Sequence, residues 1–339
     1  MHGRELIRAS IEGQTGQQLP FMPVTMSFAA RLIGVPYKKY ATDYRAQVEG
    51  QLRCAELFGI DHVSVISDPA VEASDLGGGV IYFENDPPSN DDAASLLIDK
   101  SRLASLSVVD PSKGKRMNNR LEAVAALHSR IGTELMVEGW VEGPCAEASD
   151  LRGISRLMMD FFDDPAFIKD LMEFVKEQGI AFALAQIAAG AEIIGIGDAA
   201  SSLVGPSLFT EYIKDHHKAY VKAIHDAGAL ARCHICGNTT EIIPLLHDVP
   251  YDIIDLDTMS SVAKARKALG PDRVLLGNID TVSVVRGGTV QDVERDLALC
   301  FADAERTHYV VGAGCEVPGD SPEANMLAMR NFARSHQNR

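Results

Sequence analysis

The sequence predicts an α/β protein of the (β/α)8 TIM barrel class, with residues 1–339 forming a single domain. Eight short apolar segments recur along the chain, and most are nearly continuous, as is typical of parallel strands covered on both faces. Helical patterns separate these segments, which favours a barrel. No Gly-x-Gly-x-x-Gly follows any of them, which disfavours an open dinucleotide-binding sheet. No Gly-, Ser- or Pro-rich linker divides the chain.

The eight predicted strands lie at residues 21–26, 62–66, 135–139, 192–196, 229–233, 252–256, 274–276 and 308–311. Helices are predicted between them, because apolar residues recur at helical spacing and glycine follows the last turn. The clearest are residues 46–58, 168–189, 206–227 and 262–269. The helix at 206–227 also opens with a proline, as helix starts often do.

Residues 69–120 do not fit a simple strand–helix unit. They contain the glycine-rich run that starts at Gly77 and leads into Val80-Ile-Tyr-Phe-Glu, followed by Asn85-Asp-Pro-Pro-Ser. We expect a short hairpin here, with a loop and a helix, inserted over the C-terminal mouth of the barrel.

Composition and charge exclude several classes of function. Hydrophobic residues make up 46% and charged residues 23% of the chain, which is ordinary for a globular protein. The formal net charge of −15 disfavours binding to nucleic acid or to an anionic membrane. No apolar run approaches the ~20 residues that span a bilayer, and no signal peptide is evident. We therefore expect a cytoplasmic protein whose six cysteines are thiols or metal ligands.

Soft metal ligands follow two of the predicted strands. His234 and Cys236 come after the strand at 229–233, and Cys315 comes after the strand at 308–311. Two thiolates and an imidazole suit zinc, and three protein ligands leave a fourth position free for chemistry. The alternative is that all three are ordinary core residues. Cys233 is expected to face the barrel wall instead.

Acidic residues follow other strands, where barrels of this class build their active sites. Asp257 is a candidate fourth ligand, or else it caps the helix that starts near Ser260. Asp198 and Glu142 are candidate catalytic residues, acting as general acids or orienting the substrate. The structural alternative is that Asp198 caps the next segment and that Glu142 binds loop amides.

Several motifs resemble the uroporphyrinogen decarboxylase superfamily. They are His234-Ile-Cys-Gly-Asn, Leu276-Gly-Asn-Ile-Asp, Val141-Glu-Gly-Pro and the segment from Gly314 through Asn325. The segments at 26–35 and 67–73 are similar to its corrinoid-dependent methyltransferase branch, which includes methylcobamide:coenzyme M methyltransferases. The resemblance covers nearly the whole chain. It implies a (β/α)8 barrel and a zinc ion bound by His234, Cys236 and Cys315.

The chain departs from true uroporphyrinogen decarboxylases near its start. Those enzymes grip the porphyrin carboxylates with N-terminal arginines, whereas no arginine lies between Arg8 and Arg31 here. Decarboxylation of that tetrapyrrole is therefore not expected.

The resemblance instead implies methyl transfer between a corrinoid and a small donor or acceptor. Because the chain has no Asp-x-His-x-x-Gly motif, the corrinoid (methylcobalamin) must arrive on a separate corrinoid protein. Two alternatives remain open. One is a lyase acting on a smaller acid, which needs Arg31 or Arg120 to point inward; the other is a non-catalytic zinc-binding barrel. A homodimer is also open, since related barrels often pair.

Overall fold

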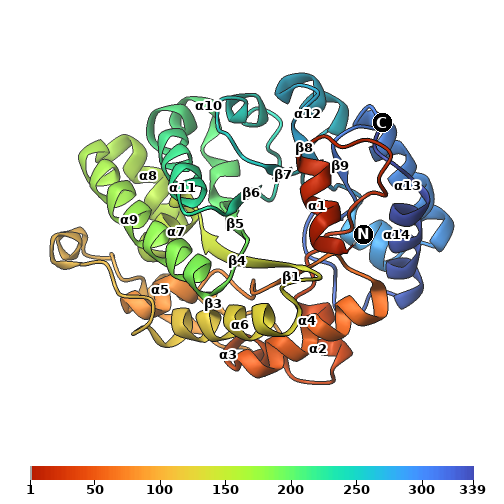
Figure 1. Ribbon diagram of the computed structural model, residues 1–339. Coiled ribbons are helices and arrows are strands. Elements are labelled where there is room, and N and C mark those ends of the chain that lie inside the picture. Colours follow the sequence, from red (N-terminus) through yellow and green to blue (C-terminus); the bar gives the residue numbers. More distant parts are fainter. Residues whose placement is uncertain (1) are drawn as a thin grey trace.

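A curled sheet of seven parallel strands, enclosed by helices, forms the centre of the protein (Figure 1). The structure is a computed structural model, and it describes residues 2–339. The strands follow one another in the order β1 (His62–Ser64), β4 (Met136–Glu142), β5 (Ile193–Gly197), β6 (Leu230–His234), β7 (Ile253–Asp255), β8 (Val274–Leu276) and β9 (Tyr309–Val310). This is an α/β fold consistent with a TIM-like barrel, and each strand falls within or overlaps a predicted one.

The first predicted strand, residues 21–26, is wrong as a strand. Only Phe21 forms a bridge, parallel to Val311. The Met22 amide donates to the Val311 carbonyl at 2.9 Å, and on the other side the Asp61 amide donates to the Phe21 carbonyl at 3.0 Å. The segment therefore connects the two edges of the curled sheet without forming a regular strand.

Side chains that point into the sheet's concave interior form layers of different character. The layer at the N-terminal ends of the strands is apolar and includes Met136, Ile253 and Val310, with Ile7 of α1 (Gly3–Ile11) packed among them. Because side chains alternate along a strand, Glu138, Trp140 and Glu142 share a face with Met136 on β4. From the N-terminal to the C-terminal ends of the strands, the interior thus has an apolar layer, a charged layer and a layer with Trp140, and it ends in a polar mouth.

Helices separate the strands largely as predicted. The remaining α-helices are α2 (Ser27–Leu32), α3 (Tyr37–Thr42), α4 (Tyr44–Phe58), α5 (Val71–Leu76), α6 (Lys115–Ile131), α7 (Pro144–Arg152), α8 (Ile154–Asp163), α9 (Pro165–Ala189), α10 (Gly205–Leu208), α11 (Lys214–Asp226), α12 (Val262–Leu269), α13 (Val290–Asp303) and α14 (Glu323–Ser335). Gly59 and Gly190 end α4 and α9 in the left-handed conformation, with φ of 62° and 116°. The predicted helix at 206–227 is interrupted by a short π-helix at Phe209–Ile213.

The stretch at residues 69–120 contains α5, the start of α6 and an antiparallel hairpin between them. The hairpin pairs β2 (Val80–Ile81) with β3 (Ser89–Asn90). Its position over the C-terminal mouth stays a prediction.

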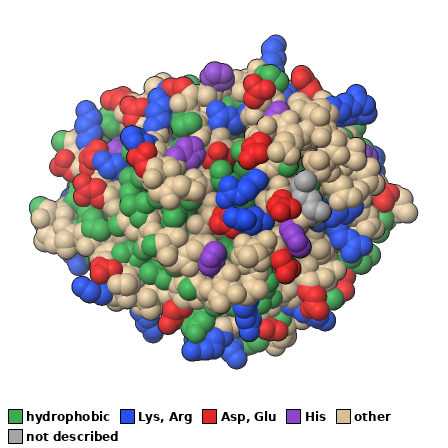
Figure 2. All heavy atoms as spheres, in the orientation of Figure 1, with side chains coloured by type: hydrophobic (Ala, Val, Ile, Leu, Met, Phe, Trp, Pro, Cys, Tyr) green, Lys and Arg blue, Asp and Glu red, His purple; other side chains and the backbone are tan. Residues whose placement is uncertain are grey.

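The molecular surface carries both signs of charge. On the face shown in Figure 2, acidic and basic side chains are interspersed, without a large field of one sign. Across residues 2–339, none of the helices combines the length and the apolar character that a bilayer crossing requires.

Candidate metal centre

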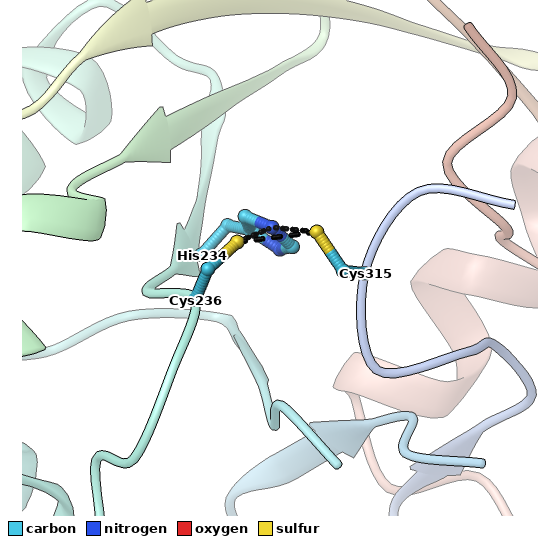
Figure 3. A group of neighbouring side chains, drawn as sticks. All are labelled: His234, Cys236 and Cys315. Atoms are coloured by element: carbon cyan, nitrogen blue, oxygen red, sulfur yellow. Dashed lines mark hydrogen bonds between the residues drawn. The ribbon is translucent and has the colours of Figure 1, made fainter. Parts of the chain in front are cut away.

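The structure brings His234, Cys236 and Cys315 together at the C-terminal ends of β6 and β9 (Figure 3). His234 Nε2 lies 3.0 Å from Cys236 Sγ and 3.7 Å from Cys315 Sγ, and the two sulfurs are 3.2 Å apart. In the described part of the chain, this is the group of His, Cys, Asp and Glu side chains whose donor atoms lie close enough to share an ion. His234 is buried, whereas both cysteines are partly accessible.

The donor set has the chemistry that zinc prefers. The hydrogen bond between Cys315 and Cys236, together with His234, lowers the pKa of the Cys315 thiol to about 4. The same hydrogen bond and burial raise the pKa of the Cys236 thiol. Two sulfurs beside an imidazole nitrogen are donors that fit zinc without rearrangement of the fold.

Asp255 and Trp140 fix the ring of His234 from two sides. Asp255 Oδ2 lies 2.7 Å from His234 Nδ1. A carboxylate only accepts hydrogen bonds, so Nδ1 carries the hydrogen and Nε2 faces the sulfurs. The ring of Trp140 meets the histidine edge-on, with centroids 5.6 Å apart. Gly195 and Gly197 of β5 make room for that indole, since a Cβ at Gly195 would lie 2.2 Å from Trp140 Cε3.

Asp257 lies next to the group but its carboxylate is occupied. Oδ2 accepts from the Gly237 amide and Oδ1 from the Met259 amide, both at 2.9 Å. The helix that begins at Val262 is capped by Ser261, so the capping alternative for Asp257 is wrong. The carboxylate instead ties the loop that carries Cys236 to the end of β7.

Asp198 and Glu142 differ sharply in their surroundings. The Asp198 carboxylate accepts from the Ala146 amide at 2.6 Å and from the Ser201 hydroxyl at 2.6 Å, and it lies 2.8 Å from His217 Nε2. These contacts join the loop after β5 to the first turn of α7 and to α11. Glu142 ends β4 on its interior face, where burial and the nearby Asp150 and Glu72 raise its pKa well above the usual range.

Glu142 belongs to a group of carboxyl groups, hereafter the acidic cluster, formed by the buried Glu72, Glu142 and Glu147 and the half-buried Asp150. Glu72 and Glu147 are 2% and 1% exposed. Neither carboxylate oxygen of Glu147 has a hydrogen-bond partner among the described residues. Burial raises the pKa of Glu72 to about 7. Four carboxyl groups so close together cannot all ionise, so the cluster retains protons at neutral pH.

Sequence reasoning missed three buried charged residues beneath the metal centre: Glu138, Arg232 and Asp255. Each interrupts an otherwise apolar strand, and that interruption is the signal that could have found them. Of the two arginines on which the lyase alternative depends, Arg31 lines the cavity described below and Arg120 does not. Arg120 is buried and donates to Gln47 and Ala41, and the exposed Arg31 donates to the Gly319 carbonyl at 3.3 Å.

A cavity of about 700 Å³ lies among α2, the loop of the β2–β3 hairpin and the segment that follows Cys315. Ser27 lines it, and the Ser27 amide donates at 2.6 Å to Glu316, the residue after Cys315. Its other polar lining residues include Arg31, Asp86, Arg286 and Asp320. His234, Cys236 and Cys315 are not among its lining residues.

Comparison with known proteins identifies relatives over nearly the whole chain. The chain is 26% identical to methylcobamide:CoM methyltransferase MtbA of Methanosarcina mazei over 300 residues, which are 86% of each protein. It is 22% identical to methylcobamide:CoM methyltransferase MtaA of Methanosarcina barkeri over 328 residues, covering 95% of this chain and 94% of that one. A uroporphyrinogen decarboxylase of Carboxydothermus hydrogenoformans is 21% identical over 243 residues.

A solved methyltransferase structure from Methanosarcina mazei superimposes with a TM-score of 0.90 over 99% of both chains, at 20% identity, and so shares the fold. The sequence model of the family "Uroporphyrinogen decarboxylase (URO-D)" matches residues 2–336. The family resemblance predicted from the motifs is confirmed: the chain belongs to the uroporphyrinogen decarboxylase (URO-D) family.

Proposed function

We propose that this protein is a zinc-dependent methyltransferase that moves a methyl group between a corrinoid, held by a separate corrinoid protein, and a small molecule. The observation that carries the proposal is the convergence of His234, Cys236 and Cys315. Relatives that cover the same length are named methylcobamide:CoM methyltransferases. We also infer that the whole chain works as one barrel domain, with the segment at Phe21 in the place of an eighth strand.

His234, Cys236 and Cys315 would hold the zinc, and Asp257 would keep the Cys236 loop in place. Zinc held there would supply a Lewis acid that lowers the pKa of a substrate thiol. In the overall reaction the thiolate sulfur forms a bond to the methyl carbon as the carbon–cobalt bond breaks. Both electrons of that bond stay with cobalt, so methyl-Co(III) becomes Co(I). The reverse direction uses the same groups.

Other residues shape the site around the donors. Trp140, with Val24 and Ile66, forms an apolar layer that excludes water from the His234 ring. Glu142 holds a proton at the mouth and orients a polar group of the substrate, whereas Asp198 keeps α7 and the loop after β5 in position. Coenzyme M, which the names of the relatives include, is the first thiol to test.

The proposal is tested with methylcobalamin as the methyl donor. The zinc-loaded protein is expected to convert the methylcobalamin spectrum to that of demethylated cobalamin when a suitable thiol is supplied. Cys315→Ala is expected to lose bound zinc and this activity while it stays folded. Cys54→Ala removes a buried cysteine far from the group and is expected to keep both.

The results also separate the alternatives. A protein that binds zinc but leaves methylcobalamin unchanged with every thiol or methyl donor contradicts methyl transfer. If Cys315→Ala unfolds together with the loss of zinc, the ion has a structural role instead. Release of carbon dioxide from a small acid by the wild-type protein would favour the lyase.

A further inference from the structure

A row of buried charged side chains crosses the interior of the sheet directly beneath the metal centre. Arg232 Nη1 donates to Glu138 Oε1 at 2.9 Å, and on its other side Nε and Nη2 donate to Asp255 at 2.9 and 2.7 Å. Asp255 in turn contacts His234 Nδ1 at 2.7 Å. His62 closes the far end, with Nε2 at 3.5 Å from Glu138. We call these residues of β1, β4, β6 and β7 the charged row.

Stability alone does not account for the charged row. Arg232 is 0% and Glu138 1% exposed, so their charges are fully removed from water. Replacing a buried ion pair by apolar side chains of similar volume is often neutral or stabilising. The layer just below shows that this interior packs well with apolar residues, since Met136, Ile253 and Val310 fill it. The charged layer therefore points to a role beyond packing.

The contacts of Asp255 show what that role is. Its Oδ2 accepts from Arg232 Nη2 and from His234 Nδ1 at the same distance of 2.7 Å. The planar guanidinium grips both carboxylate oxygens, which fixes the carboxylate in its plane. The carboxylate then fixes the rotation and the tautomer of the imidazole, and Nε2 is left facing the two sulfurs. Such partners of metal-binding histidines commonly control metal affinity.

We propose that Arg232, acting through Asp255, is a positioning residue that prebuilds the histidine arm of the metal centre before the ion arrives. The inference rests on the proposed function only for the identity of the ion. It assigns the His234 arm as a part of the centre that is fixed before the ion binds.

Zinc affinity, measured by competition with a chromogenic chelator, tests this proposal without any turnover. Asp255→Asn and Arg232→Lys are expected to weaken zinc binding about 10- to 100-fold. Cobalt(II) bound in place of zinc is expected to show an altered visible spectrum in both variants. Trp140 is the single tryptophan and contacts the His234 ring. Its fluorescence therefore reports whether each variant stays folded there.

A matched control separates the loss of His234 positioning from the general effect of replacing a buried arginine. Arg266 is 2% exposed and donates only to backbone carbonyls, among them those of Gly270, Arg273 and Thr307. Arg266→Lys is expected to lower stability while leaving zinc affinity unchanged.

The outcomes for the inference and for the proposed function are distinct. Wild-type zinc affinity and an unchanged cobalt spectrum in Asp255→Asn and Arg232→Lys would overturn the inference. An equal loss of affinity in Arg266→Lys would also overturn it. Arg232→Lys could weaken zinc binding as expected while the wild-type protein transfers no methyl group. That outcome would refute the proposed function and leave the inference supported.

Discussion

Replacing Glu72 by glutamine is expected to remove a large part of the stability loss that the protein shows as the pH rises from about 5 to about 8. Glu72 lies on α5 and is 2% exposed, and its Oε1 accepts from the Glu142 amide at 2.9 Å. Burial raises its pKa from 4.5 to about 7, and the nearby Asp68 and Asp75 add to the increase. Glutamine keeps the acceptor oxygen but never ionises, so the variant isolates the effect of the charge.

The sign follows from the direction of the pKa change. A carboxyl whose pKa is raised in the folded state stabilises the protein fully below the unfolded value of 4.5. That stability is lost as the pH rises through about 7. At about 1.4 kcal/mol for each pKa unit, the difference amounts to roughly 3 kcal/mol. Glu142, Glu147 and Asp150 have raised pKa values as well, so the wild-type protein loses stability in the same direction at each.

Urea unfolding of the metal-free protein, followed by the fluorescence of Trp140, measures the effect. Between pH 5 and pH 8, the free energy of unfolding of Glu72→Gln is expected to fall by roughly 3 kcal/mol less than that of the wild type. Glu56→Gln is the control, because the Glu56 side chain is 69% exposed on the outside of α4. Parallel pH profiles for wild type and Glu72→Gln would refute the reasoning, since Glu72 would then ionise freely.

Three further predictions concern the walls and loops of the barrel. Gly195→Ala places a Cβ against the Trp140 ring and is expected to lower the free energy of unfolding by about 1–3 kcal/mol and to shift the tryptophan emission; an unchanged urea midpoint would contradict the close packing. Asp280→Ala removes the acceptor of the Val282 and Ser283 amides and is expected to cost about 1 kcal/mol in calorimetry, while a melting temperature equal to the wild type would show that water replaces the cap. Asp257→Ala frees the Cys236 loop and is expected to speed zinc release to a chelator, and an unchanged release rate would show that this carboxylate does not hold the loop.

Local signals predicted the helix ends well. The structure gives Val262–Leu269 as a helix with the predicted bounds, because Ser261 caps its start and Gly270 stops it. The sequence predicts a continuous helix at 206–227 and does not reveal the short π-helix at Phe209–Ile213. A π-helix of 5 residues is too short to change the spacing of apolar residues in the sequence.

The first strand shows where apolar pattern misleads. Residues 21–26 are mostly apolar, yet only Phe21 pairs, through a single bridge. Pro20 and Pro23 lack the amide hydrogens that a strand in the middle of a ladder must donate. The two prolines therefore indicate the absence of a regular strand here more reliably than the hydrophobic pattern indicates its presence.

By itself, the sequence determined the alternation of strands and helices, the helix ends and the placement of His234, Cys236, Asp257 and Cys315 just after strands. These features depend on neighbours within a few residues, so local physical chemistry suffices to predict them.

Only the tertiary structure decided which side chains meet. Curling the sheet brings the end of β6 to the end of β9, so Cys315 reaches the His234 ring across the mouth, while Cys233 packs outward in the core. The same curl places Glu138, Arg232 and Asp255 of three strands in one line of contacts. Their pairing depends on strand register and on the direction of each side chain, which residues far apart in sequence acquire only when the sheet closes around them.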